Sequence, residues 1–208
     1  MSSRPTPLPN RVRPDGVIEA AGARGTLMGN RGGRLHEGFA IRRQWASRRW
    51  IACLLSFRGR QRQVMGAGYT ELFFLDEATA LAAGHRPCFE CRRAEANAFA
   101  AAWARAFGLE SPPRAEAMDL VLHAERRGPR WQADARSLPD GAMILCDEAP
   151  LLVLRGHALP WSHEGYGPAR PLPGCAVAVL TPPAICAVLA AGYRAGLHES
   201  AGRQSASR

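Results

Sequence analysis

The sequence contains no lysine: all 27 of its basic residues are arginines, and with 18 acidic residues the formal net charge is +9. An Arg-, Ala-, Gly- and Pro-rich chain is also what a G+C-rich genome encodes, so the total alone identifies no partner. Residues 1–70 hold 13 arginines and three acidic residues, whereas residues 71–208 hold 14 arginines and 15 acidic residues. The positive excess therefore lies in the first third of the chain, and a one-sided basic surface is typical of proteins that bind polyanions.

The sequence also lacks a long hydrophobic run. No apolar stretch approaches the roughly 20 residues of a membrane-spanning helix, and the first residues, MSSRPTPLPNRVRPDG, lack the apolar core of a secretory signal. We therefore expect a cytoplasmic protein of bacterial type that binds no membrane. Residues 1–14 contain four prolines, which predicts a mobile arm, and residues 200–208 are predicted to be a disordered tail.

The chain between these ends predicts an α+β fold, because strands and helices are grouped and do not alternate as βαβ units. The first 75 residues are expected to be mostly β, with a hairpin at 25–38. Helices are predicted at 76–84, 91–108, 115–127 and 181–192, where capping residues and apolar periodicity agree. We expect a β-rich N-terminal domain over 15–108 and, over 109–199, an α+β C-terminal part with a small β-rich region and a last helix.

A disulfide framework is not expected from six cysteines in a cytoplasmic chain. Cys146, Cys175 and Cys186 each stand alone in apolar surroundings and are predicted to be small buried hydrophobic residues. Cys53 and the pair Cys88 and Cys91 remain as candidates for chemistry.

The pair has C-x2-C spacing in the segment HRPCFEC, residues 85–91. A redox pair is typically found after a strand in a thioredoxin-like βαβ unit, and no such unit precedes it. Two buried free thiols are a second interpretation. A metal site is the third, and we favour it, because a turn into a helix lets two thiolates converge on one ion.

Zinc needs about four soft or borderline ligands, so a site that contains Cys88 and Cys91 requires about two further ligands from elsewhere in the chain. Cys53, in the predicted strand WIAC, is the best third ligand. His36 and His85 compete for the fourth position, and His36 is preferred because His85 is close in sequence to Cys88 and is better suited to a supporting role. The predicted ligand set is therefore Cys53, Cys88, Cys91 and His36.

The segment LFFLDEATALAAGHRPCFECRR, residues 72–93, resembles the second half of the Ada-type zinc-binding domain, the N-terminal module of bacterial methylphosphotriester-repair proteins. In that family a strand, a short helix and an RPC-x2-C turn supply the last two of four zinc cysteines. The resemblance implies that Cys88 and Cys91 are zinc thiolates and that Gly84, Arg86 and Pro87 form the turn before them. More weakly, MGNRGGRLH is similar to the start of Ada-like domains attached to nucleases, so the resemblance extends over about residues 26–93.

The chain departs from the Ada-type pattern in one important way. The family's first cysteine pair, C-x3-C, contains the thiolate that accepts a methyl group from DNA phosphate, and this sequence has no such pair. Cys53 stands alone, flanked by bulky residues in WIACLL. We therefore expect a closed, structural zinc site at this position rather than an alkyl-accepting one.

The basic first third predicts a nucleic-acid interface, with DNA favoured over RNA. Guanidinium groups match phosphate oxygens in a bidentate geometry, and two tryptophans, Trp45 and Trp50, are interleaved with them. The predicted contacts are Arg31, Arg34, Arg42, Arg43, Arg48, Arg49, Arg58, Arg60 and Arg62. The rival hypothesis is a metal-dependent or zinc-stabilised enzyme acting on a small or nucleic-acid-derived substrate, including repair by alkyl acceptance. The sequence leaves the oligomeric state open.

A second polar cluster lies in the predicted loop at 154–174, which contains His157, Trp161, His163, Tyr166 and Arg170. A His-Glu pair at 163–164 is suited to acid–base chemistry. We favour the alternative that the tryptophan and tyrosine attach this loop to the neighbouring sheet.

Overall fold

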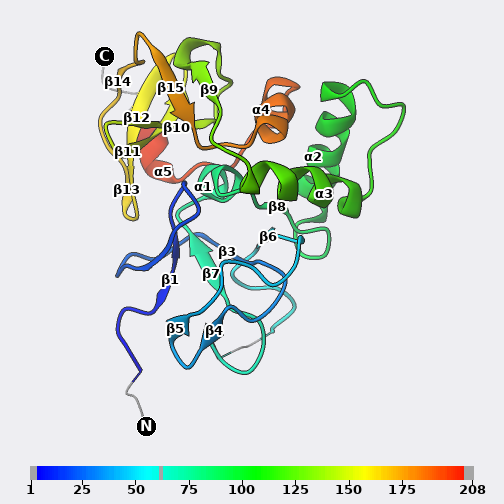
Figure 1. Ribbon diagram of the computed structural model, residues 1–208, viewed down its shortest axis with the longest axis vertical. Helices are drawn as coiled ribbons and strands as arrows, with labels where there is room; N and C mark the ends of the chain where they lie inside the picture. Colours follow the sequence, from blue (N-terminus) through cyan, green and yellow to red (C-terminus); the bar gives the residue numbers. More distant parts are fainter. Residues whose placement is uncertain (1–3, 61–62, 204–208) are drawn as a thin grey trace.

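The computed structural model describes residues 4–60 and 63–203. Figure 1 shows a β-rich N-terminal half, drawn in blue and cyan, and a second sheet in yellow and orange, with helices lying between and beside them. The α+β class predicted from the sequence is confirmed, with its strands in separate sheets and its helices grouped.

The N-terminal sheet has the order β2-β1-β7-β3-β6-β8. Most neighbours are antiparallel, but β1 runs parallel to β7 and β6 runs parallel to β8. Its strands are β1 (Pro9–Val12), β2 (Ile18–Ala20), β3 (Leu27–Asn30), β6 (Ile51–Cys53), β7 (Leu72–Phe74) and β8 (Arg86–Pro87). Gly29 lets β3 and β6 approach closely, because a Cβ there would lie 2.3 Å from the carbonyl oxygen of Ile51.

Two expectations for this half are wrong. Residues 9–12, within the predicted mobile arm, form β1, and this strand pairs with β2 and β7. Its last residue, Val12, is fully buried. The predicted hairpin at 25–38 does not form either: β3 pairs with β6 and β7, and β4 (His36–Glu37) pairs with β5 (Ala40–Ile41) in a separate small sheet. A strand of two to four residues has too short a hydrophobic pattern to specify which strand it pairs with. The pairing therefore depends on contacts with distant parts of the chain, which the local sequence does not show.

The helix α1 (Glu77–Ala82) lies at the centre of the molecule, and all six of its residues are buried. Its predicted start and end are confirmed: the Asp76 side chain accepts a hydrogen bond from the Thr79 backbone N–H, and Gly84 follows the cap with φ of 82°. One side of α1 packs on the N-terminal sheet and the other on the C-terminal sheet.

Three longer helices share one core: α2 (Arg93–Ala106), α3 (Ala115–Arg127) and α4 (Pro183–Ala190). Phe99 and Trp103, one turn apart on α2, pack with Met118 and Leu122 of α3 and Ile185 of α4. Thus α2, which the sequence analysis placed in the N-terminal domain, shares its core with helices of the C-terminal part.

The C-terminal sheet has the order β13-β12-β11-β10-β15-β9, with β14 beside β12. Its strands are β9 (Gln132–Asp134), β10 (Met143–Cys146), β11 (Ala149–Leu154), β12 (His157–Ser162), β13 (Gly165–Tyr166), β14 (Arg170–Pro171) and β15 (Ala176–Val179); a short 3-10 turn, η1 (Ala135–Ser137), follows β9. The predicted loop at 154–174 is therefore mostly strand. The predicted disordered tail begins within α5 (Glu199–Arg203), where Ala201 is buried, and residues 204–208 lie outside the described part.

Among residues 4–60 and 63–203, none of the helices combines the length and the hydrophobicity needed to cross a membrane.

Candidate metal centre

The three candidate cysteines come together where the parallel strands β6 and β8 end. Cys53 is the last residue of β6, and the Cys88 N–H donates to the carbonyl of Ala52 at 3.0 Å, which fixes Cys88 beside that strand end. Pro87 ends β8, and the chain then turns through Cys91 into α2. The turn into a helix that the C-x2-C spacing predicted is therefore present.

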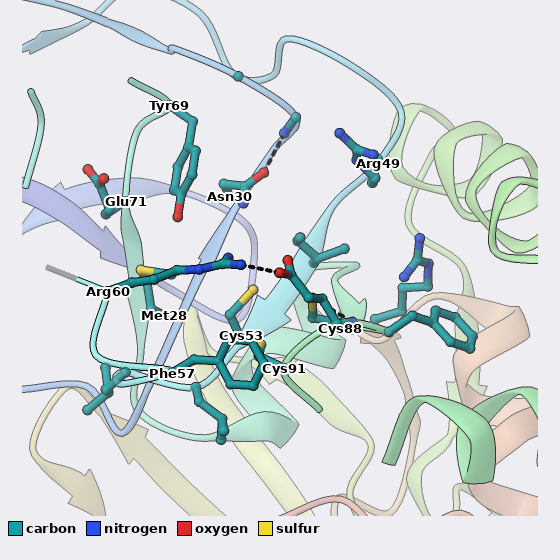
Figure 2. Close-up of a pocket in the computed structure, with 18 of the residues that line it drawn as sticks. Met28, Asn30, Arg49, Cys53, Phe57, Arg60, Tyr69, Glu71, Cys88 and Cys91 are labelled. Atoms are coloured by element: carbon teal, nitrogen blue, oxygen red, sulfur yellow. Dashed lines mark hydrogen bonds and ion pairs between the residues drawn. The ribbon is translucent and has the colours of Figure 1, made fainter. Parts of the chain in front are cut away.

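The sulfur atoms of Cys53, Cys88 and Cys91 all lie within 4.8 Å of one another, and all three residues are free thiols. Cys53 and Cys88 are buried, whereas Cys91 is partly exposed. Figure 2 shows the three side chains converging beneath Arg60. The cluster could hold a metal ion, as the sequence predicted for these residues.

Hydrogen bonds within the cluster favour one thiolate. The Cys53 thiol and the backbone N–H groups of Cys91 and Glu90 lower the pKa of Cys88 to about 5, although burial opposes this. The hydrogen bond to Cys88 and burial raise the pKa of Cys53, and burial raises that of Cys91. Without a metal, the cluster thus behaves as one thiolate shared with two thiols, and a bound cation would displace the remaining protons.

The donor set fits zinc. Soft thiolate ligands select Zn²⁺ over hard cations, and a tetrahedral site with Zn–S bonds of about 2.3 Å spaces its sulfurs about 3.8 Å apart. Sulfurs lying within 4.8 Å of one another need only a small contraction to reach that spacing. Zinc has no redox chemistry of its own and supplies Lewis acidity and thiolate stabilisation.

The structure does not bring His36 to the three sulfurs, contrary to the predicted ligand set. His36 lies in β4 of the separate small sheet, where Nδ1 is 2.6 Å from Thr70 Oγ1 and Nε2 is 3.2 Å from the Gly66 carbonyl oxygen. His85, the competing residue, is fully buried between the rings of Trp50 and Phe74 and also lies outside the cluster. In the described part of the chain, the cluster offers three candidate ligands, Cys53, Cys88 and Cys91.

The sulfurs line a pocket of about 680 Å³. Arg60 reaches across it to form an ion pair with Glu90, one of the dashed lines in Figure 2. Arg49 lies on the opposite side from Tyr69 and Glu71. The sequence analysis did not identify Tyr69 or Glu71, although an acidic residue inside the apolar strand segment YTELFFL was a usable signal.

The nine predicted nucleic-acid contacts have three different outcomes. Arg31 is almost completely buried and is part of the interior, so its prediction as a surface contact is wrong. Arg62 lies outside the described residues. The remaining seven are exposed: Arg34, Arg42, Arg43, Arg48, Arg49, Arg58 and Arg60.

The cluster predicted in the C-terminal half is built into the packing. Trp161 Nε1 donates to Thr79 Oγ1 at 3.0 Å, and the Tyr166 hydroxyl donates to Asp76 at 2.9 Å. His163 Nε2 lies 2.8 Å from a carboxylate oxygen of Glu19 in β2. Trp161 and Tyr166 thus attach this segment to the rest of the molecule, but to α1 and not to a sheet as expected; the contact with the N-terminal sheet is made by His163.

No protein-family model, curated protein or solved structure matches this chain. The resemblance to Ada-type domains therefore rests on the sequence motifs alone. What the geometry adds is the cluster of three cysteines.

Proposed function

We propose that this protein binds one zinc ion through Cys53, Cys88 and Cys91 and binds DNA through the exposed arginines of its first 60 residues. The observation that carries the proposal is the convergence of three sulfurs, from two parts of the chain far apart in sequence, to within 4.8 Å of one another. Three sulfur donors at this spacing match the arrangement that thiolates take around one tetrahedral zinc ion.

Metal analysis tests the first half of the proposal. Purified protein should contain about one zinc per chain, and Co²⁺ substitution should give thiolate-to-metal charge-transfer absorption. Cys88→Ser should abolish both. Cys175, predicted from the sequence to be buried, is exposed and lies outside the cluster, so Cys175→Ser should preserve both. Absence of zinc, with all six thiols titrating freely in the folded protein, would contradict the proposal.

The exposed arginines support the second half. Of the seven, Arg42 pairs with Glu37 and Arg60 with Glu90, both at the surface where such pairs are weak. Arg49 lines the cysteine pocket, so bound DNA would pass the metal site. A surface of this kind binds phosphates with an affinity that falls steeply with salt, because bound counterions are released on association.

A gel-shift series at increasing salt concentration tests DNA binding. The variant R42Q/R43Q/R49Q/R58Q should weaken binding to duplex DNA and reduce its salt dependence by about one unit of slope per lost phosphate contact. The matched control R136Q/R155Q/R170Q removes exposed arginines of the C-terminal half and should leave binding unchanged. Equal weakening by both variants, or no binding at low salt, would contradict this half of the proposal.

A second candidate function rests on the pocket. A structural zinc site is closed, whereas three sulfurs lining a 680 Å³ pocket leave a side of the cluster accessible. Cys91, the most exposed of the three, is then the best-placed nucleophile: its sulfur would bond to the methyl carbon of a DNA phosphotriester, and the C–O bond would break to release a phosphodiester anion. This methyl transfer can be tested by incubating the protein with methylated DNA and then measuring its intact mass and mapping its peptides. One added methyl group on Cys91 would support the transfer, and an unchanged mass would exclude it.

A further inference from the structure

A second pocket, of about 570 Å³, lies on a different part of the molecule from the cysteine cluster. Three tryptophans line it, Trp45, Trp50 and Trp131, and we call it the tryptophan pocket. Its walls come from the β1–β2 turn, the segment before β6, the turn after α1, the end of α3 and the start of α4. The volume is in the range of sites that hold a small organic ligand.

Two guanidinium groups flank one of these tryptophans, that of Arg31 buried and that of Arg126 partly buried. The Cζ atoms of Arg31 and Arg126 lie 4.1 Å and 4.5 Å from the Trp50 ring centroid. Arg31 donates to the carbonyl oxygens of Gly16 and Gln44, and Arg126 donates twice to that of Gly84. Within the described part of the chain, neither forms an ion pair with a carboxylate.

The hydrogen bonds of both guanidinium groups go to neutral acceptors, and a charge removed from water without a counter-charge is costly, so an anion near them would be stabilised. Burial, with the charge of Arg126 adding to it, lowers the pKa of Arg31 to about 9, and burial lowers that of Arg126 to about 9. Exposed Arg127 and Arg130 also line the pocket. Its lining carboxylates are Asp15, which is paired with Arg13, and Glu125, which accepts the Ala184 N–H. The pocket is therefore electropositive.

The pocket also offers an aromatic surface and an unused polar group. The Trp45 side chain is 40% exposed, and its ring lies edge-on to His123 with a centroid distance of 4.9 Å. His123 Nδ1 is buried with no hydrogen-bond partner among the described residues. An indole face stacks on planar bases, and a free imidazole nitrogen can hydrogen-bond a base edge or a phosphate.

We propose that the tryptophan pocket binds a nucleotide, with its base against Trp45 and its phosphate near Arg127 and Arg130. A nucleotide supplies a planar ring that can stack on the exposed Trp45 indole and a negative charge that balances the arginines of the lining. It could be a free mononucleotide or a nucleotide within single-stranded nucleic acid, since both present the same groups. This proposal does not depend on the zinc site or on the arginines near it.

Tryptophan fluorescence and calorimetry with AMP, GMP, CMP and UMP test the proposal, with adenosine and inorganic phosphate as partial ligands. At least one mononucleotide should bind with a dissociation constant below about 1 mM, and more tightly than either partial ligand. Trp45→Ala should weaken binding about tenfold, and R127Q/R130Q should weaken the nucleotide but not adenosine. The controls Phe107→Ala and Arg136→Gln alter an exposed aromatic and an exposed arginine outside this pocket and should change nothing.

A short single-stranded oligonucleotide distinguishes the two sources of the ligand. Tighter binding of the oligonucleotide than of any mononucleotide, lost in Trp45→Ala, identifies single-stranded nucleic acid; the reverse order identifies a free nucleotide. Mononucleotide binding without binding to duplex DNA supports this pocket and contradicts the arginine surface proposed above. No binding of any nucleotide, or equal binding by Trp45→Ala and the wild type, overturns the proposal.

Discussion

His85 is a residue whose chemistry is determined by its surroundings. It is fully buried, and its ring contacts those of Trp50 and Phe74 with centroid distances of 5.0 and 4.7 Å. Arg31 Nε donates to His85 Nε2 at 3.4 Å, which requires that nitrogen to be unprotonated. Burial first, and then the charges of Arg31 and Arg126, hold the pKa of His85 well below 6.5. His85 is therefore neutral in the folded protein.

This burial predicts a loss of stability in mild acid. Below pH 6.5 the unfolded chain takes up a proton at His85 that the folded protein does not. The stability that neutral His85 contributes to the fold is therefore present above that pH and is lost as the pH falls. Between pH 7.5 and 5.5 the loss should be about 1.4 kcal/mol. Urea unfolding of the wild type and His85→Gln at both pH values measures it. Between the two pH values, the free energy of unfolding should fall by about 1.4 kcal/mol less in His85→Gln than in the wild type. An equal fall in both proteins would show that His85 takes up its proton in the folded state as readily as in the unfolded chain.

At the residue scale, the sequence identified the groups whose role is local. Cys88 and Cys91 are close in sequence, and a helix start with C-x2-C spacing makes their convergence predictable. His36 was not predictable, because its neighbours Thr70 and Gly66 are more than 25 positions away and hydroxyl contacts leave no motif. Arg31 was mistaken for a surface residue, because the carbonyl oxygens that surround it belong to segments whose packing the sequence does not reveal.

The strand β8 and the helix α3 are joined by one buried ion pair. Arg86 donates to both carboxylate oxygens of Asp119, at 2.9 and 2.8 Å, and both side chains are less than a tenth exposed. Arg86 directly precedes Pro87 and Cys88, so this pair positions the turn that carries the cysteines. A bidentate ion pair stabilises the turn and also fixes its orientation relative to α3.

Removing one member of this pair should be costly. Asp119→Asn leaves the Arg86 guanidinium buried without a counter-charge, and the expected loss is about 3–5 kcal/mol. The double variant Arg86→Met, Asp119→Leu should lose less, because it removes both charges together. Glu199→Gln, which breaks an exposed pair with Arg203, is the control and should cost less than about 1 kcal/mol. Chemical denaturation measures all three, and a near-neutral Asp119→Asn would show that the pair does not hold the turn.

Elements with strong local signals were predicted well, and those that depend on distant partners were not. The helix α1 has a capping aspartate at its start and a glycine at its end, and both features act within a few residues. The strand β12 contains a proline and lies in a segment rich in turn residues, so it was predicted as a loop. Its hydrogen bonds to β11 and β14 exist only after the sheet has formed.

At the scale of the whole molecule, the two halves share α1. Asp76 accepts from the Tyr166 hydroxyl and the His198 N–H, at 2.9 Å each, while α1 also packs on the N-terminal sheet. Glu77 accepts from the Tyr193 hydroxyl at 2.7 Å and pairs with Arg92 at 2.9 Å. Buried polar contacts join α1 to the C-terminal part and apolar packing joins it to the N-terminal sheet, so separate unfolding of either half would break one of these two contacts. We therefore expect one cooperative transition.

Metal removal tests that cooperativity. A bound zinc would tie the end of β6 to the turn before α2, and α2 packs with α3 and α4, so chelation at the cysteines should weaken the C-terminal helices as well as the N-terminal sheet. Loss of a ligand that binds only the folded state should lower the thermal midpoint by about 10 °C for a chain of this size. Scanning calorimetry with and without a chelator should show one transition in each case. Two transitions, with the second unaffected by the chelator, would mean that the halves unfold independently and that the metal stabilises the N-terminal half alone.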